Sequence, residues 1–486
     1  MLYIRSGAIT RKLSGAERKS TMNKLVSIAL LLLGALAAAG ADIHIPIDAY
    51  KLKNGLRVIL SEDNAVPVIA VYLAYDVGAR SEERGRTGFA HLFEHMMFEG
   101  SANVPKGAHF AAVESNGGSL NGSTHPDFTD YFEVLPSNKL ATALWLESDR
   151  MRSLSITEEN LKNQKEAVKQ ERRLSFDNRP YNTAIVDIWP ALMFGNWQSS
   201  HSLIGSFEDL NASTVNDVSQ FFKSHYAPNN ATLVIVGDIQ SADAKKLIET
   251  YFGDIPSHAA PKRPDLTEPA FKPRRETYQD PLAKVPAVVI GYPGPKRRSQ
   301  DFYSMVLIDA ILTGGDSSRF YLDLVKGKES VIQYETGLGW PFANERDYRD
   351  PEPWAGLLLY KPNFTADQIV GQVQDEIAKL QNTPIDPKEL ERVKTRLRAD
   401  RIRELQSSLN RARALAQFQL ADGDPDLINT EMDELMAVTP QQIQAAATKY
   451  LKADKRAFLD ILPAPKSKTT NREENGKSAQ TGSEGR

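Results

Sequence analysis

The chain of 486 residues has no cysteine and only 8 histidines. Without cysteine there can be no disulfide framework, thiolate metal site or cysteine nucleophile, so any bound metal must be held by nitrogen and oxygen ligands. An excess of one charge is also missing, because 59 basic and 62 acidic residues give a formal net charge of −3. This balance offers no concentrated basic composition, and we expect no nucleic-acid partner.

Long apolar runs are missing except near the N-terminus, where Leu25–Ala39 follows Met22 and Lys24. The run is shorter than the roughly 20 residues of a membrane span. Small residues at Ala37, Ala39 and Ala41 fit a cleavage site. We therefore predict a cleaved secretory signal or leader over residues 1–41, and a periplasmic or secreted protein. The absence of cysteine after the run excludes an N-terminal lipoprotein.

Two alternatives for the leader stay open. The run could be an uncleaved anchor, or the basic residues before Met22 could belong to a mitochondrial presequence. The true start could be either Met1 or Met22.

Proline density marks a domain boundary. Five prolines lie between Pro256 and Pro273, and such a segment can continue neither a helix nor a central strand. We predict a linker over 259–275 between an N-terminal domain (42–258) and a C-terminal domain (276–465). The last residues, 466–486, have almost no apolar content and should be disordered.

The second domain repeats the pattern of the first. "VPAVVIGYPGP" from Val285 corresponds to "VPVIAVYLAYDVGA" from Val66, and the helical "FYSMVLIDAILTGG" follows it as "GFAHLFEHMMFEG" follows the first. Ordered matches of this kind indicate an internal duplication. We predict an α+β fold of two homologous domains, each with an antiparallel-type sheet covered by helices.

"HLFEH" carries the chemistry. A helix advances about 100° per residue, so Glu94 and His95 lie about −60° and +40° from His91, and all three share one face. The rest of this helix is apolar and should be buried, which makes a chance pair of histidines on a solvated face a poor explanation. Two imidazoles one turn apart can ligate one Zn²⁺, and the carboxylate can take a proton from water activated by the ion.

A catalytic zinc needs a third protein ligand. The helical stretch "NLKNQKEAVKQERRLSF" offers Glu166 and Glu171, and spacing alone does not choose between them.

His-x-x-Glu-His, followed by "NGGSLNGSTHPDFTDYFEVLP" and by "AVKQERR", resembles the M16 (pitrilysin/insulinase-like) zinc metallopeptidases, in particular the branch of the mitochondrial processing peptidases. The resemblance covers about residues 45–465. It implies a LuxS/MPP-like metallohydrolase fold with one Zn²⁺ per chain, held by His91, His95 and Glu171, and Glu94 as general base. The family's supporting glutamate falls on Gln164, which is a departure.

The resemblance also implies an exported zinc endopeptidase that acts on peptides or unfolded segments. Relatives bind peptide as an added strand at a sheet edge, which would here be lined by Asn121 and Thr129. From the residues alone, an ordinary hairpin is the favoured interpretation of this segment.

The second half departs further, because it has no His-x-x-Glu-His. The family's peptidases use an Arg/Tyr pair, seven apart, from such a domain. Tyr334 is present, but Gly327 stands seven before it, Lys326 is no bidentate donor, and Arg319 is interpreted as a structural arginine. We therefore predict the zinc-bearing subunit of a two-chain peptidase whose zinc-less homologous partner carries Arg and Tyr, or alternatively a homodimer.

Two other classes of function compete with this one. The chain could be a catalytically silent assembly or scaffold homologue, although all four motif residues are present, or a zinc-binding scaffold without hydrolysis, for which Glu94 would have no use. We interpret His109 and His125 as surface or turn residues, and the basic loop Tyr292–Asp301 as a solvated turn.

Overall fold

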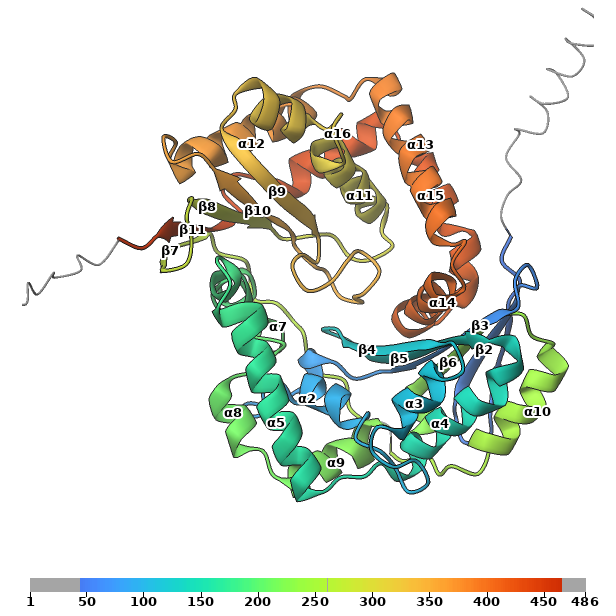
Figure 1. Cartoon of the computed structure of the whole chain (residues 1–486). Helices are drawn as coiled ribbons and strands as arrows, with labels where there is room; N and C mark the ends of the chain where they lie inside the picture. The colour runs from blue at the N-terminus through green and yellow to red at the C-terminus, as the bar shows by residue number, and fades with distance from the viewer. Residues whose placement is uncertain (1–43, 260, 466–486) are drawn as a thin grey trace, which may run out of the picture. The chain divides into compact units, whose positions relative to one another are not determined.

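The computed structural model describes residues 44–259 and 261–465, whose strands form two sheets (Figure 1). The predicted leader (1–41) and tail (466–486) lie outside the described residues. None of the helices in the described part of the chain is both long and apolar enough to cross a bilayer.

The first sheet is built before the proline-rich segment. Its strands are β1 (Asp48–Lys51), β2 (Arg57–Glu62), β3 (Val68–Tyr75), β4 (Ser119–Thr124), β5 (Thr129–Pro136) and β6 (Ala231–Gly237). The helices of this half are α2 (Phe89–Met96), α3 (Ala108–Glu114), α4 (Leu140–Ser153), α5 (Glu158–Arg172), α6 (Trp189–Met193), α7 (Trp197–Ser200), α8 (Phe207–Ala212), α9 (Val215–His225) and α10 (Ser241–Phe252).

The second sheet follows residues 256–273, which form neither helix nor strand where they are described. Its strands are β7 (Arg274–Asp280), β8 (Ala287–Tyr292), β9 (Val331–Leu338), β10 (Trp354–Tyr360) and β11 (Ala457–Pro463). Its helices are α11 (Gln300–Thr313), α12 (Ala366–Asn382), α13 (Pro387–Glu404), α14 (Ser408–Asp422), α15 (Glu431–Ala437) and α16 (Pro440–Tyr450).

The strand orders confirm the predicted duplication. The first sheet runs β1-β2-β6-β3-β5-β4 and the second β7-β11-β8-β10-β9, so the two agree strand for strand once β1 is set aside. Each has one parallel pair, β2–β6 or β7–β11, among antiparallel neighbours. One helix has the same place along the chain in both halves. Helix α2 follows β3 and precedes the edge strand β4, and α11 follows β8 and precedes the edge strand β9.

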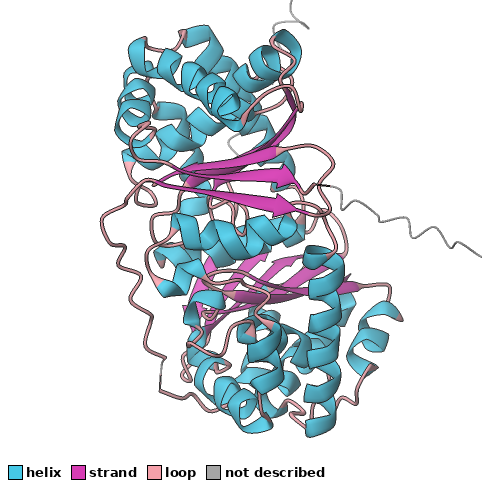
Figure 2. Ribbon diagram, turned by 90° about the vertical axis from the view of Figure 1, so that its left-hand side faces the viewer, coloured by secondary structure: helices cyan, strands magenta, loops and turns pink. Residues whose placement is uncertain are grey.

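Successive side chains of a strand point to opposite faces of its sheet, so each sheet needs two covers. On one face, β3 contributes Ile69, Val71 and Leu73 to a core shared with the helices of its own half. In the second half, Val288 and Ile290 of β8 do the same. Figure 2 shows helices packed against the strands.

The other face of each sheet is covered by a helix from the opposite half. Helix α14 packs on β3 and β6 of the first sheet. In return, α6 packs on β7, β8 and β11 of the second, where the buried Trp189 joins Val289 and Leu459. Removing a buried aromatic ring of this kind costs about 3–5 kcal/mol, so this exchange contributes substantially to the fold.

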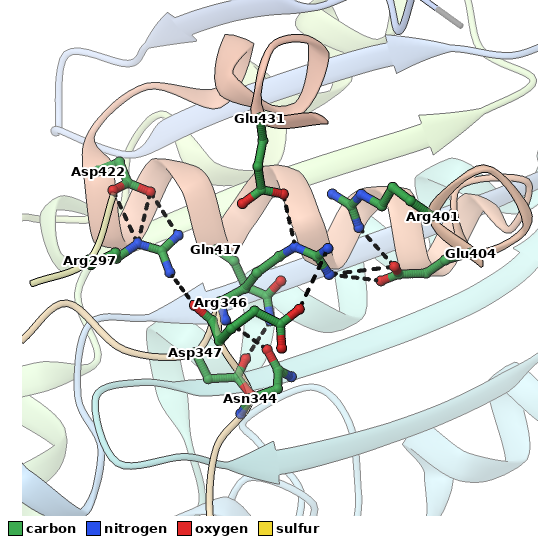
Figure 3. A network of polar contacts seen from close by, with 10 residues as sticks. Arg297, Asn344, Arg346, Asp347, Arg401, Glu404, Gln417, Asp422 and Glu431 are labelled. Carbon is green, nitrogen blue, oxygen red and sulfur yellow. Dashed lines mark hydrogen bonds and ion pairs between the residues drawn. The ribbon is translucent and has the colours of Figure 1, made fainter. Parts of the chain in front are cut away.

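A buried polar network surrounds α14 (Figure 3). Arg297 donates to both oxygens of Asp422, and Arg346 pairs with Glu431. The interpretation of the loop Tyr292–Asp301 as a solvated turn is therefore wrong at Arg297, which is only 6% exposed. A long-range partner, 125 residues away in sequence, explains why the local pattern missed it.

Candidate metal centre

Helix α2 presents His91, Glu94 and His95, and its other side chains anchor it in the core. Phe89, Leu92 and Met96 are buried, as the apolar pattern predicted. The N-cap residue before the helix is Gly88, which has a left-handed φ of 81°. A Cβ there would lie 2.6 Å from the carbonyl oxygen of Ile204, so only glycine fits at this point.

A buried carboxylate caps the start of α2 from outside the helix. Glu82 accepts from the backbone N–H of Gly88 at 2.9 Å and of Ala90 at 2.8 Å. His201 lies 3.0 Å from the same carboxylate. Negative charge at a helix N-terminus is stabilising, so Glu82 fixes the position from which the histidines project. No sequence signal marked this residue, because it stands seven positions before the first residue of the helix and lacks the spacing of a capping box.

The second contributor is α5, which packs against α2. Glu171, in the last turn of α5, places Oε2 3.2 Å from His95 Nε2 and 3.6 Å from His91 Nε2. The three ligand atoms of these residues all lie within 4.8 Å of one another. Glu166 instead pairs with Lys169 at 2.6 Å and is 63% exposed. The geometry therefore brings Glu171, and not Glu166, to the two histidines.

The protonation of His91 and Glu171 suits ligation of a cation. Burial, together with the nearby His95, lowers the pKa of His91 to about 4, so its ring is neutral at physiological pH. The hydrogen bond with His95 lowers the pKa of Glu171, which keeps this group a carboxylate. Neutral imidazole and carboxylate are the forms that bind a metal.

Glu94 lies beside this group but is held apart from it. Its Oε2 accepts from Thr124 Oγ1 at 2.7 Å, at the end of the edge strand β4. Burial raises the pKa of Glu94, which brings it closer to the range of a general base at neutral pH. Gly122 of β4 allows this approach, because a Cβ there would lie 3.1 Å from Glu94 Cγ.

The two residues predicted to line the substrate edge have different positions. Asn121 is exposed on β4, the last strand in the sheet order, and lines a pocket with Glu94, His95 and Phe98. Thr129 belongs to the inner strand β5, is fully buried and donates to the carbonyl of Val77 at 2.8 Å. The prediction for Thr129 is therefore wrong, because an inner strand between β3 and β4 has no free edge.

A second group with metal-ligand chemistry lies in the core. His109 Nε2 is 2.5 Å from Glu133 Oε1, and Glu147 completes the group. The interpretation of His109 as a surface or turn residue is wrong, since it is 4% exposed. Its partner Glu133 lies 24 residues away on β5, beyond the reach of a local pattern.

This core group is already neutralised without an ion. Arg150 donates to both carboxylate oxygens of Glu147. Burial lowers the pKa of His109 to about 3 and raises that of Glu133 to about 8, so the pair is neutral at pH 7. All four side chains are buried and closed to substrate, so we interpret the group as structural. His125, by contrast, does lie in the turn between β4 and β5 and pairs with Asp130 at 3.2 Å.

In the second half, the candidate residues Tyr334 and Arg319 form hydrogen bonds with residues of that same half. Tyr334 places its hydroxyl 2.9 Å from Ser318 Oγ and donates to the carbonyl of Thr313. Gly327 ends the short helical segment η6 (Tyr321–Gly327). Arg319 forms a two-fold hydrogen bond with Glu389, as expected of a structural arginine.

Comparison with known proteins adds two family matches. Residues 57–205 match the family model "Insulinase (Peptidase family M16)", and residues 213–397 match "Peptidase M16 inactive domain". The first range contains His91, Glu94, His95 and Glu171, and the second contains none of them.

Individual relatives match most of the chain. The zinc protease PqqE of Helicobacter pylori is 27% identical over 459 residues, which cover 91% of this chain and 99% of that protein. A probable mitochondrial-processing peptidase subunit beta of Schizosaccharomyces pombe is 23% identical over 76% of this chain and 81% of its own length. Among solved structures, a Helicobacter pylori protease superposes with a TM-score of 0.80 at 24% identity, covering 86% of this chain and all of that one.

The periplasmic protease PqqL of Escherichia coli shares the fold over only part of its length. It matches 87% of this chain but 48% of its own, with a TM-score of 0.69 and 18% identity. This chain therefore corresponds in fold to one half of that protein.

Proposed function

Because the chain belongs to the M16 peptidase family, we propose that it is a zinc-dependent endopeptidase that hydrolyses peptides or unfolded segments. The observation that carries the proposal is the convergence of His91 Nε2, His95 Nε2 and a Glu171 oxygen, with Glu94 beside them. Two relatives in bacteria are named zinc proteases, which supports the choice of metal.

The residues fit a zinc ion. Two imidazole nitrogens and one carboxylate oxygen are a common ligand set for a catalytic zinc, which keeps its fourth position open. Glu171 is 39% exposed and His95 24%, so the group is open to solvent on one side, whereas His91 is nearly buried. Zinc bound there would supply Lewis acidity, lowering the pKa of water to about 7 and polarising a carbonyl.

Glu94 is the general base of this proposal. Its carboxylate is oriented by Thr124 and desolvated by burial, so it can accept a proton from water and return it to the leaving amine. The substrate chain would lie along the edge of β4, whose exposed Asn121 faces the same pocket as Glu94. Main-chain hydrogen bonds to an edge strand tolerate many side chains, which suits an enzyme for unfolded segments.

We also propose that a second chain completes the site. The two-chain hypothesis is supported by Tyr334, whose hydroxyl is engaged by Ser318 and Thr313, and by Gly327 in place of the arginine. A zinc-less homologue carrying Arg and Tyr, or alternatively a second copy of this chain, would fill this role. Full peptide turnover by the monomer alone would contradict it.

Export remains part of the proposal. It is supported by the apolar run Leu25–Ala39 and the small residues at Ala39 and Ala41. N-terminal sequencing of protein recovered from an expressing cell tests it, and an intact N-terminus at Met1 or Met22 would argue against cleavage.

The experiment that tests the enzymatic function is Glu94→Gln, with Glu166→Gln as its matched control. The chain from about Asp42 is assayed on quenched peptides, with and without a candidate zinc-less partner, and bound zinc is measured. We expect Glu94→Gln to keep its zinc and to lose about 10²–10⁴-fold in turnover, as removal of a general base does. The control should behave as wild type. Equal cleavage by Glu94→Gln would remove Glu94 from the mechanism.

A further inference from the structure

Gln164 occupies the position where related peptidases carry a supporting glutamate, yet it contacts the metal group. It lies on α5, seven residues before Glu171, and therefore on the same face of the helix. Its Oε1 atom is 3.2 Å from His95 Nδ1. The ring nitrogen that faces Gln164 is thus the one turned away from Glu171 and His91.

The orientation of the Gln164 amide is set by its other neighbour. Gln164 Nε2 lies 2.6 Å from Glu99 Oε1, and Lys106 Nζ donates to the other oxygen of Glu99 at 2.5 Å. Glu99 is 6% exposed, so this carboxylate is fixed within the structure. A carboxylate only accepts hydrogen bonds, which means that the NH₂ group must face Glu99 and the amide oxygen must face His95.

This orientation determines the tautomer of His95. An amide oxygen can only accept, so His95 Nδ1 must carry a proton, and in the neutral ring that binds a metal the lone pair is therefore on Nε2. That lone pair is on the side of Glu171 Oε2 and His91 Nε2. His91 is different, because its buried Nδ1 has no hydrogen-bond partner among the described residues.

We propose that Gln164, oriented by Glu99 and Lys106, is a positioning residue that fixes His95 in the Nδ1–H form and presents its Nε2 to the metal. The inference rests on the proposed zinc-peptidase function. Related peptidases have a carboxylate at position 164. In this chain the carboxylate belongs to Glu99, and the neutral amide of Gln164 lies between Glu99 and His95. A metal-ligating histidine usually donates its other N–H to such a partner.

The arrangement makes a distinctive prediction for glutamate at position 164. In this chain Gln164→Glu would place two carboxylates about 2.6 Å apart, at the distance that now separates Gln164 Nε2 from Glu99 Oε1. Like charges so close repel each other, so the familiar residue should weaken the site. Exchanging both groups, in Gln164→Glu/Glu99→Gln, restores a carboxylate facing His95 and an amide that can donate to it and accept from Lys106.

Zinc affinity in the absence of any substrate tests this inference. The dissociation constant is measured by competition with a chelator for the wild type, Gln164→Ala, Gln164→Glu, Glu99→Gln and the double exchange. We expect Gln164→Ala to bind zinc about 10–100-fold more weakly, the usual cost of losing such a partner. Both single exchanges should also weaken binding, and the double exchange should return to within about threefold of wild type, since contacting residues are not additive.

A spectroscopic readout separates positioning from a merely structural role. The ¹⁵N shifts of the His95 ring should report the Nδ1–H tautomer in the wild type and the double exchange, and a mixture in Gln164→Ala. Thermal unfolding of the zinc-free proteins checks that each variant is folded. Wild-type zinc affinity in a folded Gln164→Ala, or a double exchange no better than the single ones, would overturn the inference. A wild-type chain that binds no zinc would instead overturn the proposed function.

Discussion

The two halves of the chain place a helix at the same point of the same strand order, but they treat ionisable groups there in opposite ways. In the first half, α2 turns two histidines toward Glu171 of α5. In the second half, α11 carries Asp309 in its third turn, whose Oδ1 accepts from Trp354 Nε1 and Thr336 Oγ1, each at 2.6 Å. The Glu171 carboxylate faces two imidazoles, a set that suits a cation, whereas the Asp309 carboxylate is satisfied by hydrogen bonds from neutral donors.

The helices that pack against α2 and α11 show the same contrast. Helix α5 brings Glu171 and Gln164 to α2, whereas α13 brings Arg396, whose Nη2 donates to the carbonyl of Ala310 on α11 at 3.2 Å. A guanidinium at this point supplies its own positive charge and repels a metal ion. The two halves therefore share their packing, while a few side chains decide whether each half can hold a metal.

Zinc affinity should fall most when the first half loses its metal-binding carboxylate. Glu171→Gln removes the only carboxylate that touches both histidines among the described residues. We expect zinc affinity to fall by more than about 100-fold, since losing even an outer partner costs about 10–100-fold. Chelator competition measures it, and the exposed Glu166→Gln is the control. Unchanged zinc affinity in Glu171→Gln would show that this carboxylate does not account for the difference between the two halves.

Removal of the Asp309 carboxylate from α11 should lower the stability of the fold and leave zinc binding unchanged. Asp309→Ala leaves the Trp354 indole without its acceptor, whereas the Thr336 hydroxyl keeps Thr313 Oγ1 at 2.9 Å. An unpaired buried donor of this kind costs about 1–3 kcal/mol, so the free energy of unfolding should drop by roughly that amount. Denaturant unfolding measures the loss, with the exposed Asp375→Ala as control. A loss of bound zinc in Asp309→Ala would show that the second half takes part in the site.

The edge strands offer a smaller test. A Cβ at Gly122 of β4 would lie 3.1 Å from Glu94 Cγ, whereas a Cβ at Gly337 of β9 meets nothing closer than Trp340 Cβ at 4.0 Å. Displacement of a catalytic group by a few tenths of an ångström should lower kcat/KM by about tenfold in Gly122→Ala, given that 1 Å can cost about 100-fold. Gly337→Ala should be neutral. Equal rates for both variants would show that β4 does not determine the position of the reacting groups.

The smallest effect concerns the helix starts. Helix α11 is capped by the neutral hydroxyl of Ser299, and α2 by the carboxylate of Glu82 beside His201. Burial opposes a charge on His201, but the hydrogen bond to Glu82, the charge of Glu82 and the backbone hydrogen bonds together outweigh burial and raise the pKa of His201. Burial also raises the pKa of Glu82. The folded chain therefore binds these protons more tightly than the unfolded chain.

The sign of the pH dependence follows directly. The stabilisation is complete below the unfolded pKa values and is lost as the pH rises through the folded ones, so the free energy of unfolding should fall above about pH 6.5 for His201. One such proton contributes a slope of at most about 1.4 kcal/mol per pH unit. His201→Gln should flatten the curve relative to the wild type, and the exposed His258→Gln should not. Identical slopes for the two variants would contradict this account of the cap.

Sequence alone could predict what depends on local periodicity. The face shared by His91, Glu94 and His95, the burial of α2 and the duplicated strand pattern follow from spacings of one turn or two residues. Glu171 could be preferred to Glu166 only through the family resemblance, because both lie on one helix and only packing decides which of them meets α2.

What could not be predicted depends on long-range partners. The prediction for Thr129 is wrong because the resemblance covers both strands of the hairpin and does not specify which of them lies at the edge of the sheet. His109 was misjudged because Glu133 lies on a different element. The exchange of α6 and α14 between the sheets escaped detection for the same reason, since an apolar helix face does not specify which sheet it covers.

The most direct test is the location of zinc in a crystal of the full chain, by anomalous diffraction at the zinc absorption edge. We predict one strong peak per chain, at about 2.0–2.2 Å from His91 Nε2, His95 Nε2 and a Glu171 oxygen. A peak at His109, Glu133 and Glu147 instead, or a protein that takes up no zinc at the α2 histidines, would contradict the account.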